Sequence, residues 1–215
     1  MNDSISLGSI GSEKRLERRD AAENRTLILA TADRLFAQQG VANINMADIA
    51  QAAGVGKGTL YRRFANKAEL CLALMDTQML DFQNGMLSRM RQMTLDGVPT
   101  LVQLDQFLDA LVYFTDTHSP LLCEVQRGGL LDVVGEQQRP HFWQHMTISG
   151  LLQTAVHNNE LPATLDISYI ADALLAPLHA NIFYFQRQGR GFSLERISAG
   201  LRSIVHGLQY LQADE

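Results

Sequence analysis

Residues 54–70 read GVGKGTLYRRFANKAEL, and this stretch decides how the N-terminal part of the chain folds. It holds three glycines, four basic residues and one tyrosine. Residues 46–53 before the glycines have helical apolar spacing, and so do residues 57–64. A short helix, a glycine turn and a second short helix predict a helix-turn-helix, in which Gly54 supplies a positive φ where the chain reverses.

Apolar residues of the two short helices are spaced so that the helices pack on each other. Ile49, Ala50 and Ala53 face inward on the first helix, and Leu60 and Phe64 lie four residues apart on the second. The outward side chains are cations and hydroxyl groups: Lys57, Thr59, Tyr61, Arg62 and Arg63. Such groups contact phosphates and base edges. On spacing alone, an ordinary solvated basic face fits these residues equally well.

Capping signals mark the helix boundaries around this motif. Asn45 precedes the first short helix and Asp48 follows three residues later, which is the pattern of a capping box. Asn66 and Glu69 repeat the pattern before a long helix that is expected to reach about residue 93. Both pairs predict where helices begin.

The run MADIAQAAGVGKGTLYRRFANKAEL at residues 46–70 resembles the signature of the tetracycline-repressor (TetR) family of transcriptional regulators. The resemblance covers about residues 23–75, including RLFAQQG upstream. It implies a DNA-binding helix-turn-helix joined to a helical body that binds a small molecule and dimerises. The remaining two thirds of the chain match the family only in size, helicity and two long closing helices.

The resemblance assigns DNA contacts to Asn45, Lys57, Thr59, Tyr61, Arg62, Arg63 and Lys67. Asn45 stands where the family often has a phosphate-contacting threonine, Tyr61 matches a phosphate-binding position, and Lys67 matches a lysine that touches the DNA backbone. Two departures leave the operator sequence open. Gly56 replaces the usual Ser or Thr cap, and Arg63 stands where histidine is common.

Gly58 joins this set for a reason of its own. Together with Gly56 it keeps the first turn of the second short helix slim, so that backbone N–H groups can approach a phosphate.

Charge is distributed unevenly along the 215 residues. The net charge is −5, but residues 1–70 hold ten Lys/Arg against eight Asp/Glu, while residues 71–215 hold eight against fifteen. A polyanionic partner is therefore expected at the N-terminal end. Two cysteines, no secretory signal and no apolar run of membrane-spanning length favour a cytoplasmic protein without membrane contact.

Helical periodicity continues through the rest of the chain, so the expected fold class is all-α. We expect a flexible arm at residues 1–21, a three-helix DNA-binding domain at 22–67, and a larger ligand-binding and dimerisation domain at 68–215. Ser119 and Pro120 are expected to open a new helix as N-cap and first residue.

Five of the eight methionines, at positions 75, 79, 86, 90 and 93, share one face of the long helix after residue 66. They form either a core seam or the adaptable wall of a pocket. Candidate ligand-binding residues in the body are Met86, Met90, Phe107, Phe114, His118, Phe142, Trp143 and Phe183. A mainly apolar cavity of this composition favours an apolar or aromatic small molecule. The acidic bias of residues 71–215 slightly favours a neutral or cationic one.

Other chemistry has weak support in the sequence. His141 and His145 lie four residues apart, as in a helical metal site, but no local carboxylate or cysteine completes a ligand set. No nucleophile–base pair, paired-acid motif or phosphate loop is recognisable. We expect no catalytic residues, no metal and no cofactor.

Two apolar stretches close the chain, at about residues 166–188 and 193–211. Ile170, Leu174 and Leu178 lie at helical spacing in the first, as do Leu201 and Leu208 in the second. These stripes serve intramolecular packing or, by resemblance, the interface of a homodimer.

The sequence thus predicts a dimeric repressor that is released from a palindromic operator in double-stranded DNA by a small-molecule effector. Two alternatives stay open: an architectural or cell-division DNA-binding factor of the same fold without an inducer, and a helical enzyme or carrier.

Overall fold

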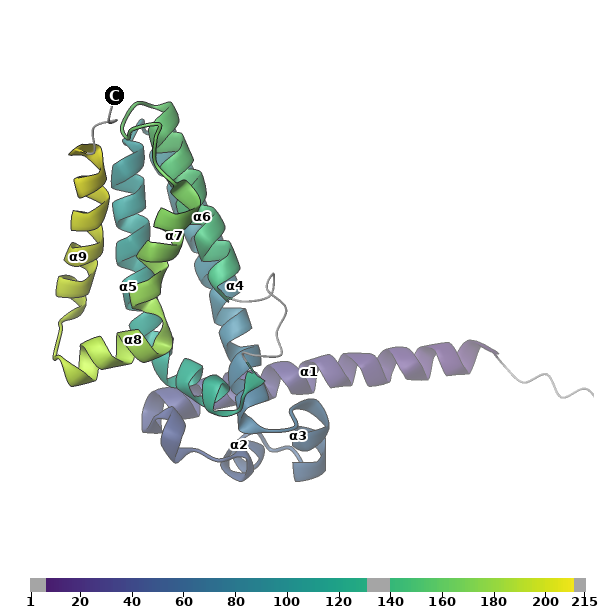
Figure 1. The fold of residues 1–215 in the computed structure, drawn as a ribbon. Coiled ribbons are helices and arrows are strands. Elements are labelled where there is room, and N and C mark those ends of the chain that lie inside the picture. Colours follow the sequence, from purple (N-terminus) through teal and green to yellow (C-terminus); the bar gives the residue numbers. More distant parts are fainter. Residues whose placement is uncertain (1–6, 131–139, 211–215) are drawn as a thin grey trace, which may run out of the picture. The chain divides into compact units, whose positions relative to one another are not determined.

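The computed structural model describes residues 7–130 and 140–210, and every regular element in these ranges is helical (Figure 1). The predicted all-α class is confirmed. The chain divides into two compact units, Met1–Leu74 and Met75–Glu215, so the first two turns of α4 (Lys67–Leu95) belong to the first unit. No helix of the described ranges is both long and apolar enough to cross a membrane.

The first unit contains α1 (Leu7–Gln39), the 3₁₀ turn η1 (Val41–Asn43), α2 (Met46–Ala52), α3 (Lys57–Arg63) and the start of α4. Its helices bury apolar residues at the predicted spacing: Ile28, Ala32, Ile49, Ala50, Leu60, Phe64 and Leu70. α1 contacts α2, and α2 contacts α3. The small side chains of Ala50 and Ala53 let these short helices approach closely.

The N-terminal helix begins earlier than its apolar pattern. The expected start lay near residue 22, after a flexible arm, whereas the helical backbone of α1 runs from Leu7. Residues 13–24 are mostly Glu, Lys, Arg, Leu and Ala, which have high intrinsic helix propensity. Local propensity, which needs no buried stripe, accounts for the difference.

The second unit is built around α5 (Thr100–Arg127), which contacts α6 (Pro140–His157), α8 (Ala180–Tyr184) and α9 (Leu194–Gly207). α6 in turn packs against α7 (Ile167–Leu175). Leu104, Phe107, Leu108 and Leu111 of α5 are completely buried in one apolar core with residues of these neighbours. Burial of each such side chain contributes about 1.5–3 kcal/mol.

α5 continues through Pro120, so the prediction that a helix begins at Ser119 was wrong. A proline inside a helix leaves the carbonyl four residues earlier without its N–H donor. In this chain the Ser119 hydroxyl donates to that carbonyl, on Asp116, at 3.0 Å. The local sequence therefore offsets part of the disruption, and packing of α5 in the core supplies the rest.

Pro177 interrupts the first of the two closing stretches. After α7 the chain forms the 3₁₀ turn η4 (Ala176–Leu178), then α8 and the π-helical segment η5 (Phe185–Gly189), before α9 and the 3₁₀ turn η6 (Leu208–Tyr210). Leu174, Leu178 and Leu201 of the predicted stripes are buried in their own chain. The intramolecular alternative is thus confirmed for these residues.

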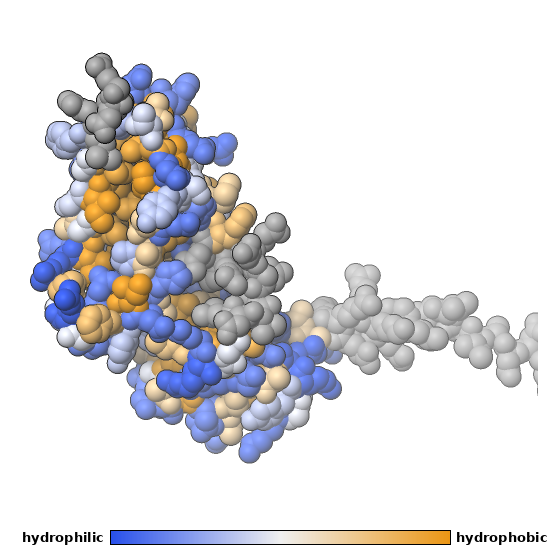
Figure 2. All heavy atoms as spheres, in the orientation of Figure 1, coloured by the Kyte–Doolittle hydropathy of each residue, from blue (hydrophilic) through white to orange (hydrophobic). Residues whose placement is uncertain are grey.

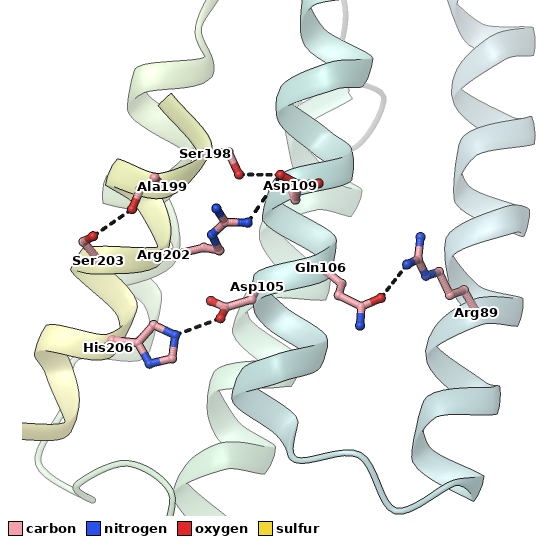
Figure 3. Close-up of polar contacts among 9 residues, drawn as sticks. All are labelled: Arg89, Asp105, Gln106, Asp109, Ser198, Ala199, Arg202, Ser203 and His206. Atoms are coloured by element: carbon pink, nitrogen blue, oxygen red, sulfur yellow. Dashed lines mark hydrogen bonds and ion pairs between the residues drawn. The ribbon is translucent and has the colours of Figure 1, made fainter. Parts of the chain in front are cut away.

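Polar pairs lie along the contact between α5 and α9 (Figure 3). Asp109 accepts a hydrogen bond from the Ser198 hydroxyl at 2.6 Å and lies 3.5 Å from the Arg202 guanidinium. One turn away along α5, Asp105 and His206 are 2.8 Å apart, and this hydrogen bond raises the pKa of the imidazole. Such pairs fix the register of α9 on α5, because a shift of either helix would separate them.

Glu160 ties the segment after α6 to the start of α5. Its two carboxylate oxygens accept hydrogen bonds from the backbone N–H groups of Thr100 and Leu101, each at 2.8 Å. Burial raises the pKa of Glu160, but these two hydrogen bonds and those of the Thr100 and Asn158 side chains outweigh it, so the pKa lies below its ordinary value. The carboxylate thus caps α5 from outside the helix.

Glu160→Gln is expected to destabilise the protein by about 1–3 kcal/mol at neutral pH, because an amide offers one acceptor oxygen for two N–H donors. Since the pKa of Glu160 is lowered, its stabilisation is present above the ordinary pKa and is lost as pH falls through the lowered value. Urea unfolding at pH 7 and near pH 3 should therefore show a difference from wild type that shrinks in acid. Glu195→Gln, on an exposed residue in the first turn of α9, is the control. An equal loss in both variants would contradict this role.

Candidate nucleic-acid interface and effector site

The start of α2 is fixed by the predicted capping box. The Asn45 side-chain oxygen accepts hydrogen bonds from the backbone N–H groups of Ala47 at 2.8 Å and Asp48 at 3.1 Å. The Asp48 carboxylate accepts one from the Asn45 N–H at 2.8 Å. The cap occupies the oxygen of Asn45 and leaves its NH₂ group on an exposed residue, where a phosphate could accept from it.

The turn between α2 and α3 has the geometry that the glycine pattern predicts. Gly54 has φ of 66°, a conformation that side-chain-bearing residues rarely adopt. The Val55 N–H donates to the Ala50 carbonyl at 3.0 Å, and Ala53 is buried beneath the turn. These contacts hold the orientation of α3 against α2.

α3 presents one exposed face of basic and small residues. Lys57, Gly58, Tyr61 and Arg62 are exposed, with Tyr61 at 51%, whereas Thr59 and Arg63 are half-buried. Spacings of three and four residues place the exposed members of this set on one side of the helix. The predicted outward direction is thus confirmed for Lys57, Tyr61 and Arg62, while the contact of these residues with DNA stays a prediction.

Lys67 has a structural role that the sequence did not indicate. Its ammonium donates to the Val41 carbonyl at 2.5 Å and lies 5.9 Å from the centre of the Phe36 ring. α4 begins beside it with the predicted cap, in which the Asn66 side chain accepts from the Glu69 N–H at 2.9 Å. An ammonium has three N–H donors, so a phosphate contact of Lys67 remains compatible with these bonds.

Arg25 is a cation near α3 that the sequence analysis missed. It is exposed on α1, and its guanidinium carbon lies 5.5 Å from the centre of the Phe64 ring, at the end of α3. Only the packing of α1 against the helix-turn-helix brings these positions together. Arg25 therefore joins the candidate DNA-contacting cations of the first unit.

Four of the predicted ligand-binding residues gather in one aromatic cluster of the second unit, which we define as Phe82, Phe107, Phe114, His118 and Trp143. Phe82 lies 4.4 Å from Phe114 and 6.1 Å from Trp143 between ring centres, and Phe107 lies 5.6 Å from Trp143. His118 stacks on Phe114 at 3.9 Å. Phe82, which joins α4 to the cluster, was not predicted.

The other predicted ligand-binding residues lie elsewhere in the second unit. Met86 is buried in the core and Met90 packs against it, as the core-seam interpretation of the methionine stripe predicts. Phe183 is completely buried in the core, and Phe142 is 45% exposed. Helical spacing identified apolar faces but did not distinguish a core side chain from a pocket side chain.

A metal site is not indicated by the described residues, among which no three His, Cys, Asp or Glu side chains come together. His145 instead pairs with Asp172 at 2.8 Å, and the side chain of His141 lies outside the described residues.

Comparisons with known proteins agree with this geometry. Residues 28–74 match the model described as bacterial regulatory proteins, tetR family. An HTH-type transcriptional regulator of Staphylococcus aureus (strain MRSA252) is 29% identical over 178 residues, which are 83% of this chain and 90% of that protein.

Solved structures share the fold at lower identity. A TetR-family transcriptional regulator from Pectobacterium atrosepticum is 18% identical, with a TM-score of 0.67 over 91% of this chain and 99% of that one. A transcriptional regulator from Saccharomonospora viridis, solved in complex with choline, is 17% identical, with a TM-score of 0.65 over 86% of this chain and 96% of that one.

Gly58→Ala is expected to separate folding from DNA binding. A Cβ at this position would meet no atom within 4 Å, and alanine favours a helix over glycine, so stability should be unchanged or raised by up to about 1 kcal/mol. If a DNA backbone approaches α3 closely here, the added methyl group should weaken duplex binding. Thermal unfolding and fluorescence anisotropy with labelled duplex measure the two effects. Unchanged DNA affinity would show that no close approach occurs at Gly58.

Proposed function

We propose that the chain, which matches the tetR family of bacterial regulatory proteins over residues 28–74, is a repressor that binds a palindromic operator as a homodimer. It releases this operator when a small molecule binds in the body. The chain is a DNA-binding transcriptional regulator rather than an enzyme. Repression, the palindrome, the dimer and the effector are the proposed parts.

The observation that carries the proposal is the exposed face of α3. Within the described part of the chain, the side chains of Lys57, Tyr61 and Arg62 form no hydrogen bond or ion pair, although the buried side chains of Leu60 and Phe64 hold this helix in the core of the first unit. Long cationic side chains without internal partners on a rigid helix suit contacts to phosphates and base edges. Arg62 is the candidate for guanine recognition, because its planar fork can bond two acceptors at once.

A homodimer is supported by what remains exposed after the second unit has folded. Figure 2 shows hydrophobic residues gathered over α9 and the adjoining part of α5. Ile204 of α9 is 51% exposed, and Ile182 of α8 is 47% exposed. Gly200 and Gly207 are exposed on α9 as well, and small residues permit close approach of another helix. Two recognition helices related by a two-fold axis would fit a palindromic operator.

The aromatic cluster is the proposed effector site. It joins α4, α5 and α6, so a ligand that separates its rings would alter how these helices pack. Ring faces and edges favour an apolar, aromatic or cationic guest over a sugar phosphate. The choline complex of the Saccharomonospora viridis regulator supports small-molecule binding by this fold.

Release of DNA follows from linked equilibria. An effector lowers DNA affinity only if it binds the arrangement that holds DNA poorly more tightly than the arrangement that holds it well. Coupling energies of about 1–3 kcal/mol, typical of allosteric proteins, would lower operator affinity by roughly 5–150-fold.

Duplex binding is expected to weaken as salt rises, because each phosphate contact releases counterions. Lys57→Gln and Arg62→Gln should each make the logarithm of the binding constant fall less steeply with the logarithm of the salt concentration, by the amount that about one phosphate contact contributes. Arg62→Gln should also change sequence preference. Anisotropy titrations between about 50 and 200 mM salt, on fragments selected from genomic DNA, measure both effects. Arg127→Gln in the second unit is the control. Salt-independent binding, or binding to no duplex, would overturn the proposal.

Ile204→Lys is expected to convert the dimer into a folded monomer. Ile204 is half exposed and is not one of the buried core residues of the second unit, so a lysine there should not disturb the fold. Leu201→Lys, at a residue 2% exposed, should instead unfold the second unit. Sedimentation at micromolar concentration, together with thermal unfolding, separates the two results. Leu80→Lys, on a residue of α4 that is 56% exposed, is the control. A monomeric wild type would contradict the dimer.

A further inference from the structure

An open groove of about 730 Å³ lies at one end of the second unit. It is lined by the end of α4, the turn to α5, the start of α5 and the end of α6. This volume lies within the range of small-molecule sites, about 300–1,000 Å³. All its lining residues belong to the second unit. It shares only Met90 with the residues that the sequence suggested for an effector, and none with the aromatic cluster.

Polar groups of the groove are largely engaged with one another. Gln103 donates to the Val98 carbonyl at 2.9 Å and accepts from the Thr94 hydroxyl at 3.2 Å. Asn158 donates to the Thr100 hydroxyl at 3.0 Å, and the Glu160 carboxylate holds the two N–H groups at the start of α5. A sugar would therefore find few groups to replace its lost hydration.

Apolar side chains make up the other part of the lining. Leu87, Met90, Val98 and Leu151 all border the groove, and Leu87 is 52% exposed. An apolar body placed against them would remove this surface from water, at about 25 cal/mol per Å² of apolar area buried.

Arg91 gives the groove its unbalanced charge. It is exposed and lines the groove, and its side chain forms no hydrogen bond, ion pair or ring contact with the described part of the chain. The acidic residue in the lining, Glu160, is already committed to the N-terminus of α5. A guanidinium is always charged, and its planar fork matches a carboxylate.

We propose that this groove binds a small monocarboxylate with an apolar body, whose carboxylate pairs with Arg91 while its body packs on Leu87, Met90 and Leu151. The single charge of Arg91 matches the one negative charge of a carboxylate better than the two charges of a phosphate ester. The same positive charge disfavours an amine, which is itself cationic. The site does not depend on the proposed function, because ligand binding is measured without DNA.

The test uses the full-length protein and three probes of one shape: phenylbutyrate, the uncharged phenylbutanol and the cationic phenylbutylamine. Calorimetric titration and saturation-transfer NMR of the phenyl protons measure binding. We expect phenylbutyrate to bind saturably and at least about tenfold more tightly than the other two, the equivalent of one charge-assisted pair. Arg91→Gln should remove that preference while leaving phenylbutanol binding unchanged.

Three further variants test whether Arg91 and the groove, rather than another site, bind the probes. Arg89→Gln changes a neighbouring cation that donates to Gln106 at 2.6 Å and does not line the groove, so phenylbutyrate binding should stay at the wild-type level (Figure 3). Leu87→Ser, on an exposed residue that the fold does not need, should weaken all three probes. Equal binding of the three probes by the wild type, or no saturable binding, would overturn the site. So would loss of binding in Phe114→Leu but not in Arg91→Gln, because the carboxylate would then occupy the aromatic cluster.

Discussion

Burial of α5 is the constraint on which the second unit depends. This helix contacts α6, α8 and α9, and the side chains that it buries completely in the core include Leu104, Phe107, Leu108 and Leu111. At about 1.5–3 kcal/mol each, they outweigh the cost of about 3 kcal/mol for a proline inside a helix. Before it reaches Pro120, α5 also carries the contact of its first turn with Glu160, the polar pairs with α9 and the Arg187–Asp116 ion pair at 2.9 Å.

Charged side chains of the second unit pair with other helices, whereas cations on α3 of the first unit are exposed without such partners. In the second unit, Asp105, Asp109, Asp116 and Glu160 each have a partner that fixes one helix against another. On α3 the cations Lys57 and Arg62 are exposed, and the helix is held in its core by Leu60 and Phe64 without them. A long charged side chain gains little from ordering unless a partner compensates for the lost side-chain entropy. An unengaged cation on a rigid element is therefore available to a partner outside the chain, and the same holds for Arg91 in the groove.

Much of the first unit could be predicted because its signals are local. The capping box at Asn45, the positive φ of Gly54 and the inward direction of Ile49 and Leu60 each depend on residues within a few positions. The second unit was less predictable. Phe82 joins the aromatic cluster through the packing of α4 near α5 and α6, and the burial of Phe183 differs from the exposure of Phe142 although both are aromatic residues in apolar stretches. Helical spacing shows on which face of its helix a residue lies, but it does not show which other element packs against that face.

The sequence by itself determined the all-α class, the helix-turn-helix, the capping box of α2, the turn at Gly54, and the outward direction of Lys57, Tyr61 and Arg62 on α3, since these follow from short-range periodicity and backbone preferences. Only the tertiary structure decided that α5 passes through Pro120, that Leu201 belongs to its own core, that Lys67 bonds to the Val41 carbonyl and that Arg25 lies beside Phe64. Each of these depends on contacts between residues far apart in the chain. Their energies come from burial and hydrogen bonds across elements, which the order of residues within one element does not encode.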